Sequence, residues 1–554
     1  MSSKSLDLAI SHPWSPPRFT QSLRMPWPSS NKTPPARHIF YDVKFYPYYT
    51  SQTSTPVFAL VGNREIIIAR PSGAPARNVE ILHNFRDAEA VSADSNASVL
   101  NSCSWNYLDP SQPLISVAGP SGSIKVLNAL TGEVVRTLLG HGAEINDLAT
   151  HPHYPWILAS ASGDHSIRIW DLRDRPEREG NACLIICGHG LAHKEPILTC
   201  AFHGTGRYLI SGGQDHAICL WSLPDFAQDG ASSDDLESKK GPPRSSDETR
   251  VIHYPHFMTS AVHGNYVDCV CFFGDLILSK AAEEKKIVMW SITGFNSKGP
   301  NPSSESAPVG NRHVETRSAF VSNESSHRGP GESIESISED RIPLLTRLLE
   351  FKVPNADPFY IRFSLLLPSL TYPHLHPMLL IGNMSSQVLF WDLSSLELGQ
   401  GEENKFKKPK APGKHGLGDP LSRRALERFQ SSEHRSESPF GWSSRRSSSV
   451  LTTTASSPAI FSNHDPDIST TGSSPFPVEQ LTDVIDTAHQ TPRPSRFRIN
   501  DPFKPLEAHF AHTPNVDYHL AARQTAWSPC GRWCIIAGES GPKDALAVLY
   551  ERWT

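Results

Sequence analysis

The stretch Gly140–Arg173, GHGAEINDLATHPHYPWILASASGDHSIRIWDLR, opens on Gly-His and closes on Trp-Asp-Leu-Arg. Between these marks lie two alternating apolar runs, ILASAS and IRIW, which are typical of β-strands. The Gly-Asp pair between the runs favours a tight turn, where an aspartate side chain can bond nearby backbone. The stretch therefore predicts a small antiparallel sheet that is bracketed by a histidine and a tryptophan.

The last strand of this stretch has several copies along the chain. IRIWDL at 167–172 recurs as ICLWSL at 218–223, IVMWSI at 287–292 and VLFWDL at 388–393, and more weakly as IKVLNAL from Ile124. Each copy follows another strand and a polar turn. A period of about 40–45 residues with Gly-His and Trp-Asp marks is the signature of WD repeats, whose small sheets bury both faces by closing into a ring of blades.

We therefore expect an all-β fold, a seven-bladed WD40 β-propeller with long disordered insertions. The last predicted blade, RQTAWSPCGRWCIIAGESGPKDALAVLYERW, contains three strands, so a strand from the N-terminal region should supply the fourth and close the ring. The predicted blades start near Phe40, Asn101, Glu144, Pro196, Tyr266, Tyr360 and Ala521.

The composition suits a β-rich body that carries long polar insertions, since the 554-residue chain contains 47 prolines and 38% hydrophobic residues. We predict a disordered N-terminal segment at 1–37 and a propeller at 38–554. Low-complexity inserts at about 225–249, 296–339 and 399–500 offer few aliphatic side chains to offset chain entropy. The formal charge of −5 gives no global positive field, so direct sequence-specific DNA binding is not expected.

The histidine and the tryptophan of a repeat need polar partners, because a buried imidazole or indole N–H without one costs about 1–3 kcal/mol. In WD repeats these partners are a serine of the second strand and an aspartate of the turn, and we expect the same set here. The predicted structural tetrads are His141, Ser160 (or Ser162), Asp164 and Trp170 in one blade, and His193, Ser211, Asp215 and Trp221 in the next.

The chain contains none of the catalytic motifs G-x-S-x-G, H-E-x-x-H, G-x-x-x-x-G-K-S/T or G-x-G-x-x-G. The histidine pairs 151/153 and 374/376 lie in proline-flanked loops without a third ligand nearby, so no metal site is predicted. The nine cysteines include no C-x-x-C pair, and no apolar run of about 18 residues could span a membrane. These features predict a non-enzymatic, intracellular binding protein without a cofactor.

Beyond the generic repeat, several strings resemble the Extra sex combs or EED family, the WD40 subunits of Polycomb repressive complexes. NYVDCVCFFGDLILSK at 265–280 is the most specific of them. The strings GHGAEINDLATHP, SASGDHSIRIW, FYIRFS, LLIGNMSSQVLFWDL and ARQTAWS support the resemblance. It extends from about Phe40 to the C-terminus, with the long inserts unmatched.

The resemblance implies a seven-bladed propeller with two working surfaces. One end of the channel would carry an aromatic cage for trimethyl-lysine of a histone tail, and the opposite face would hold a helix of the SET-domain methyltransferase subunit. Binding of the mark would stimulate the methyltransferase and so support transcriptional silencing. The resemblance also implies a nuclear location and other Polycomb complex subunits as partners.

The resemblance assigns the cage residue by residue. FYIRF supplies Phe359 and Tyr360, where the family usually has Trp-Tyr. Tyr41 matches a family Phe, with Phe40 as the alternative if the register slips by one, and Asn101 stands where the family has Tyr. Three aromatic residues still present π faces to a quaternary ammonium group, but the loss of one wall should weaken the cage.

Polar residues at the same end of the channel are matched as well. The resemblance implies contacts with the histone peptide from Asn146, Arg362 and Arg523. Because Ile361 and Phe363 alternate with Arg362, Tyr360 is expected at the start of a strand, near the channel mouth, with its ring facing solvent.

A second interpretation comes from another functional class. A WD40 adaptor, such as a substrate receptor of a ubiquitin ligase, would also be a propeller that binds proteins. That interpretation leaves NYVDCV and FYIRF unexplained. The basic tract Lys405–Lys414 is either a nuclear-import signal or a charged insert without a specific partner.

Overall fold

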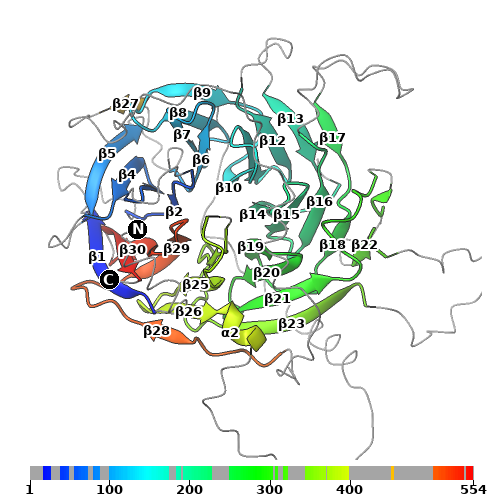
Figure 1. Ribbon diagram of the computed structural model, residues 1–554. Helices are drawn as coiled ribbons and strands as arrows, with labels where there is room; N and C mark the ends of the chain where they lie inside the picture. The colour runs from blue at the N-terminus through cyan, green and yellow to red at the C-terminus, as the bar shows by residue number, and fades with distance from the viewer. Residues whose placement is uncertain are drawn as a thin grey trace, which may run out of the picture.

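The computed structural model describes most of the predicted blades and little of the low-complexity inserts. In the described residues the strands form seven sheets, which stand around one centre as the blades of a β-propeller (Figure 1). The prediction of a seven-bladed propeller is confirmed. The described residues are 16–25, 38–48, 55–72, 79–87, 99–173, 182–188, 191–226, 249–303, 306–309, 316–321, 343–369, 371–398, 451–453, 503–541 and 544–552.

The first four blades, numbered in chain order and given from the channel outward, contain four or five strands each. Blade 1 has β2 (Asp42–Phe45), β3 (Phe58–Gly62), β4 (Glu65–Arg70), β5 (Glu80–Asp87) and β27 (Leu451–Thr453). Blade 2 has β6 (Ser102–Tyr107), β7 (Pro113–Ala118), β8 (Ile124–Asn128) and β9 (Val134–Leu138). Blade 3 has β10 (Ile145–Thr150), β11 (Ile157–Ser162), β12 (Ile167–Asp171), β13 (Cys183–Cys187) and β17 (Arg250–Ile252). Blade 4 has β14 (Ile197–Phe202), β15 (Tyr208–Gly213), β16 (Ile218–Ser222), β18 (Phe257–Thr259) and β22 (Arg317–Ser318).

The remaining three blades are four-stranded. Blade 5 has β19 (Val267–Phe273), β20 (Leu276–Ala281), β21 (Lys286–Ile292) and β23 (Leu345–Lys352). Blade 6 has β24 (Ser364–Leu366), β25 (Met378–Gly382), β26 (Val388–Asp392) and β28 (Phe510–His512), and the short helix α2 (Leu393–Leu398) follows β26. Blade 7 has β29 (Ala521–Trp527), β30 (Trp533–Ser540), β31 (Asp544–Glu551) and β1 (Arg18–Met25).

The two ends of the chain close the ring together. β1 pairs antiparallel with β31, from Arg18 opposite Glu551 to Met25 opposite Ala545, and Figure 1 shows blue β1 beside the red strands of blade 7. This is the strand that the sequence predicted from the N-terminal region. It also corrects the prediction of disorder across 1–37, because these eight residues order by covering the open edge of β31.

Two other predicted inserts contribute short strands at the outer edges of blades. β22 lies within 296–339 and pairs with β18, and the backbone of β27, within 399–500, pairs with β5. Phe226, at the start of the 225–249 tract, is buried in the core between blades 3 and 4. These residues correct the predicted insert boundaries, and most of the inserts lie outside the described residues.

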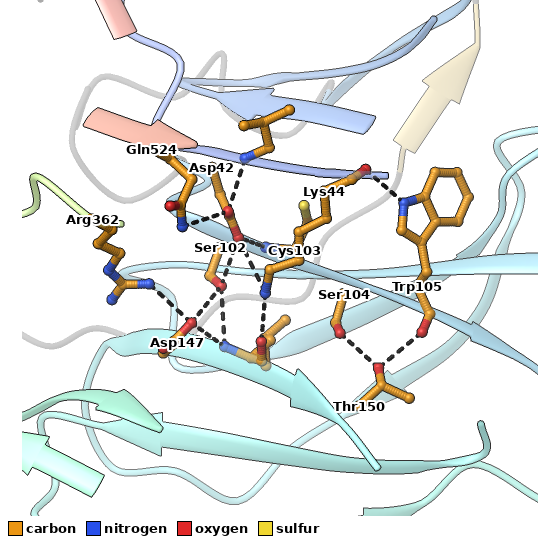
Figure 2. A network of polar contacts seen from close by, with 12 residues as sticks. Asp42, Lys44, Ser102, Cys103, Ser104, Trp105, Asp147, Thr150, Arg362 and Gln524 are labelled. Atoms are coloured by element: carbon orange, nitrogen blue, oxygen red, sulfur yellow. Dashed lines mark hydrogen bonds and ion pairs between the residues drawn. The ribbon is translucent and has the colours of Figure 1, made fainter. Parts of the chain in front are cut away.

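Buried aspartates join the inner strands of neighbouring blades. Asp42 Oδ2 accepts a hydrogen bond from the N–H of Cys103 in blade 2 at 2.9 Å, and Asp147 Oδ2 accepts one from the N–H of Cys200 in blade 4 at 3.1 Å. Gln524 of blade 7 donates to Asp42 Oδ1 at 3.1 Å (Figure 2). These carboxylates satisfy backbone donors that an inner strand leaves unpaired on its channel side.

Candidate functional site

The polar residues of the third blade form one buried chain of hydrogen bonds. His141 Nδ1 lies 2.8 Å from Asp164 Oδ2, and His141 Nε2 lies 2.7 Å from Ser160 Oγ. Trp170 donates from Nε1 to the same hydroxyl at 2.8 Å. Ser160 is therefore the serine of this tetrad, while Ser162 accepts the backbone N–H of Asp164.

The same arrangement recurs in blade 4. His193 lies 3.0 Å from Asp215 through Nδ1 and 2.9 Å from Ser211 through Nε2. Trp221 donates to Ser211 Oγ at 3.0 Å. In both blades the polar atoms of the imidazole and indole groups are hydrogen-bonded to these partners, which indicates a structural role.

A third tetrad, in blade 5, was missed by the sequence analysis. His263 lies 2.7 Å from Glu284 through Nδ1 and 2.7 Å from Ser279 through Nε2, and Trp290 donates to Ser279 at 2.9 Å. A glutamate takes the place of the aspartate in the turn. The signal that could have found it is His263 standing before the strand that leads to IVMWSI.

The candidate binding residues gather at one end of the central channel. Each inner strand is the first of its own blade, so the starts of these strands meet at the same end. Tyr41 directly precedes β2, Asn101 directly precedes β6, and Phe359 and Tyr360 come shortly before β24; all four are half-buried. The alternative register is wrong, because Phe40 is fully buried in the core between blades 7 and 1.

Tyr360 reaches across the channel from blade 6 to blade 3. Its hydroxyl donates to Asn146 Oδ1 at 2.9 Å, and its backbone N–H donates to Asp268 Oδ2 at 2.8 Å. Burial raises the pKa of the Tyr360 hydroxyl, which keeps it a hydrogen-bond donor. Its φ of 63° is in the left-handed region that residues with a side chain rarely adopt.

These contacts correct two expectations about Tyr360. It is not at the start of a strand, because β24 begins only at Ser364 and the left-handed turn intervenes. Its ring does not simply face solvent, because it is half-buried and the guanidinium carbon of Arg362 lies 4.8 Å from the ring centroid. The ring of Phe359 meets that of Tyr360 at 5.2 Å and 63°, so the two aromatic rings form a corner.

The three predicted peptide-contact residues all have partners within the chain. Arg362 is 4% exposed and pairs with Asp147 at 3.0 Å. Burial opposes the charge of Arg362, but Asp147 beside it holds the guanidinium pKa above its usual value. Asn146 donates to a backbone carbonyl of blade 4 at 2.9 Å, and Arg523 pairs with Glu539 at 2.7 Å. The Arg362–Asp147 pair belongs to a wider buried polar network, in which Ser102 lies within hydrogen-bond distance of both Asp147 and Asp42 (Figure 2).

Asn101 contributes a polar side chain where the other three positions are aromatic. Its amide Oδ1 is buried and accepts no hydrogen bond from the described residues. Beside it is Gly119, where an added Cβ would lie 3.5 Å from that oxygen and 1.9 Å from the carbonyl oxygen of Val99. The close approach of the chain at Val99 therefore requires glycine there and leaves the Asn101 side chain without a bulky neighbour on that side.

Other chemistry was sought in the part of the chain that the structure describes. No group of three or more His, Cys, Asp or Glu residues there could hold a metal ion. No helix in those ranges is long and apolar enough to cross a membrane. His151, one of the paired histidines, instead accepts two backbone N–H groups through Nδ1 and contacts the carbonyl of Gly206 in the next blade at 3.2 Å.

Comparison with known proteins gives the family of this propeller. A family model described as WD domain, G-beta repeat matches residues 132–171 and 184–222. The chain is 32% identical over 576 residues to Polycomb protein EED of Chaetomium thermophilum, covering 93% of this chain and 91% of that one. The chain belongs to the EED family of Polycomb WD40 proteins. The resemblance first seen in NYVDCVCFFGDLILSK and its companion strings is confirmed.

Other members of the EED family show the same kinship. Polycomb protein esc of Drosophila melanogaster is 33% identical over 240 residues, which cover 42% of this chain and 52% of esc. A crystal structure of the Chaetomium thermophilum Polycomb repressive complex 2 contains a chain with a TM-score of 0.66 and 29% identity, with 98% of both chains covered. A structure of ctPRC2 in complex with H3K27me3 and H3K27M matches with a TM-score of 0.66, 30% identity and coverage of 98% and 99%.

Membership in the EED family bears on both functional classes considered above. EED proteins are non-catalytic WD40 subunits, so this chain is not an enzyme. The match extends over nearly the whole chain and includes the strings that a generic adaptor leaves unexplained. It therefore favours the Polycomb interpretation over a ubiquitin-ligase substrate receptor.

Proposed function

We propose that this protein is the scaffold and trimethyl-lysine reader of a Polycomb-type histone methyltransferase complex in the nucleus. The observation that carries the proposal is the aromatic corner of Phe359 and Tyr360, half-buried at the channel end that also bears Tyr41. A structure of the related ctPRC2 with H3K27me3 supports a methylated histone tail as the ligand.

The corner suits a quaternary ammonium group for a physical reason. Trimethyl-lysine has no N–H to donate, so its charge is best stabilised by the faces of aromatic rings, at about 0.5–2 kcal/mol for a good contact. One face of Tyr360 is already covered by Arg362, so the ligand is expected on the other face and against Phe359. Asp147 neutralises Arg362 and reduces its repulsion of the incoming cation.

We further propose that the bound mark stimulates the SET-domain subunit, which would dock on the opposite face of the propeller with other Polycomb subunits. Stimulation requires that the mark bind the active arrangement of the complex more tightly than the inactive one. A coupling of about 1–3 kcal/mol is typical of such linkage. The expected outcome is the spread of a repressive histone mark and transcriptional silencing.

Calorimetric titration with trimethylated and unmethylated histone H3 peptides tests the reading function. The wild-type protein should prefer the trimethylated peptide, and Phe359→Ala should weaken that binding by about 2- to 30-fold. Phe359→Leu is the matched control, because it keeps apolar bulk but lacks a π face. Loss in the alanine variant alone would point to packing, and equal binding of both peptides by the wild type would leave only the scaffold function.

Tyr360→Ala should also reduce binding of the trimethylated peptide, but it is a less clean test. The variant removes the hydrogen bond to Asn146 across the channel as well as the ring. Tyr360→Phe separates the two effects, since it keeps the π face and removes only the hydroxyl. We expect the phenylalanine variant to retain most of the affinity and the alanine variant to lose it.

A further inference from the structure

The most family-specific string of the sequence contains a fully buried ion pair. In NYVDCVCFFGDLILSK, Asp268 lies on β19 and Lys280 on β20, and Lys280 Nζ is 3.2 and 3.1 Å from the two carboxylate oxygens. Both side chains are 0% exposed. Removing two charges from water costs free energy that their attraction scarcely repays, and apolar replacements of such pairs are often as stable. Stability alone therefore does not explain this pair.

The partner of Asp268 distinguishes it from the other inner-strand aspartates. Asp42 and Asp147 each accept the N–H of a residue within the inner strand of the following blade. Asp268 instead accepts the N–H of Tyr360, in the segment ahead of β24. In blade 5 the buried carboxylate thus holds the segment that carries the aromatic corner.

The segment before β24 requires stabilising contacts, because Tyr360 has an unfavourable backbone conformation. A φ of 63° costs a residue with a Cβ about 1–2 kcal/mol, and such residues persist only where their surroundings fix them. Asn146 fixes the hydroxyl and Arg362 covers the ring, whereas Asp268 acts on the backbone itself. The rings of Phe359 and Tyr360 meet at 63° within this left-handed turn.

We propose that Asp268 is a positioning residue for the aromatic corner, and that Lys280 keeps its carboxylate directed at the Tyr360 N–H. This inference rests on the proposed reading function. It gives the NYVDCV…LILSK string a role in ligand recognition rather than in the stability of blade 5. The essential feature is a hydrogen-bond acceptor at residue 268.

Two double variants of the full-length chain isolate that acceptor. Asp268→Val/Lys280→Met removes both charges and the acceptor, while Asp268→Asn/Lys280→Met removes the charges and keeps an acceptor. Trimethylated and unmethylated histone H3 peptides are titrated into each variant and the wild type, and thermal unfolding is measured in parallel. Both variants should remain folded with one cooperative thermal transition near that of the wild type, because a buried ion pair can often be replaced by uncharged side chains with little loss of stability.

The valine variant is expected to bind the trimethylated peptide about tenfold more weakly than the wild type, since an unmet buried N–H lets the turn relax. The asparagine variant should bind within about twofold of the wild type, since its acceptor is retained. Equal affinities of the two variants, beside a wild type that distinguishes the peptides, would overturn the positioning role alone. A wild type that binds both peptides alike would overturn the reading function and this inference with it.

Discussion

Asn101→Tyr should add the missing aromatic side chain to the proposed cage and increase its affinity for the trimethylated peptide. Asn101 is half-buried directly before β6, at the same channel end as Tyr41 and the aromatic corner. Its Oδ1 is buried without a hydrogen bond from the described residues, so its replacement breaks no hydrogen bond made by that oxygen. Gly119 beside it presents no side chain that a larger residue at position 101 would meet.

The size of the effect follows from the exposure of the site. A cation–π contact contributes about 0.5–1 kcal/mol at an exposed position and about 2 kcal/mol where it is desolvated. A half-buried position should lie between these values, at about 1 kcal/mol, which corresponds to an approximately fivefold lower Kd. The gain should appear for the trimethylated peptide alone, because only its ammonium group lacks N–H donors.

Asn101→Leu is the control that gives this experiment its meaning. It also removes the buried amide and adds apolar bulk, but it has no π face. Both variants are titrated calorimetrically with trimethylated and unmethylated histone H3 peptides at one salt concentration. If leucine tightens binding as much as tyrosine, the gain is due to apolar packing; if tyrosine brings no gain, position 101 is not a wall of the cage.

Three further predictions concern the propeller itself. Trp170→Ala should lower the free energy of unfolding by about 3–5 kcal/mol in urea denaturation, because it leaves a cavity and removes a partner of Ser160; a midpoint equal to that of the wild type would refute the tetrad. Burial opposes ionisation of Glu284, but the charge and hydrogen bond of His263 hold its pKa at about 2, below the ordinary 4.5. Glu284 therefore stabilises the fold above pH 4.5, and the loss of about 1 kcal/mol of its contribution between pH 7 and pH 4 should be absent in Glu284→Gln; identical pH profiles would contradict this. Deletion of residues 1–25 removes β1 and exposes the edge of β31, so we expect a melting temperature several degrees lower and self-association in sedimentation; a monomer of unchanged stability would show that β1 is dispensable.

The sequence by itself determined the repeat and the features that a single blade encodes. The spacing of His141, Asp164 and Trp170 reflects contacts within one small sheet, where strand register and a tight turn bring near neighbours in sequence together. Alternating apolar runs likewise predicted the blades, because each strand buries its side chains by a local periodicity. The family was readable from NYVDCV and FYIRF before any fold was known.

The tertiary structure decided the contacts that span the ring. Tyr360 and Asn146 meet across the channel from blades 6 and 3, and no local pattern links two residues so far apart in the chain. Tyr360 has a left-handed backbone conformation, donates its N–H to Asp268 and packs its ring against Arg362. These features depend on where β24 starts once the ring of blades has closed. Local periodicity specifies a blade, but the geometry of the channel end arises only when seven blades are packed around a common axis, and that is where the candidate site lies.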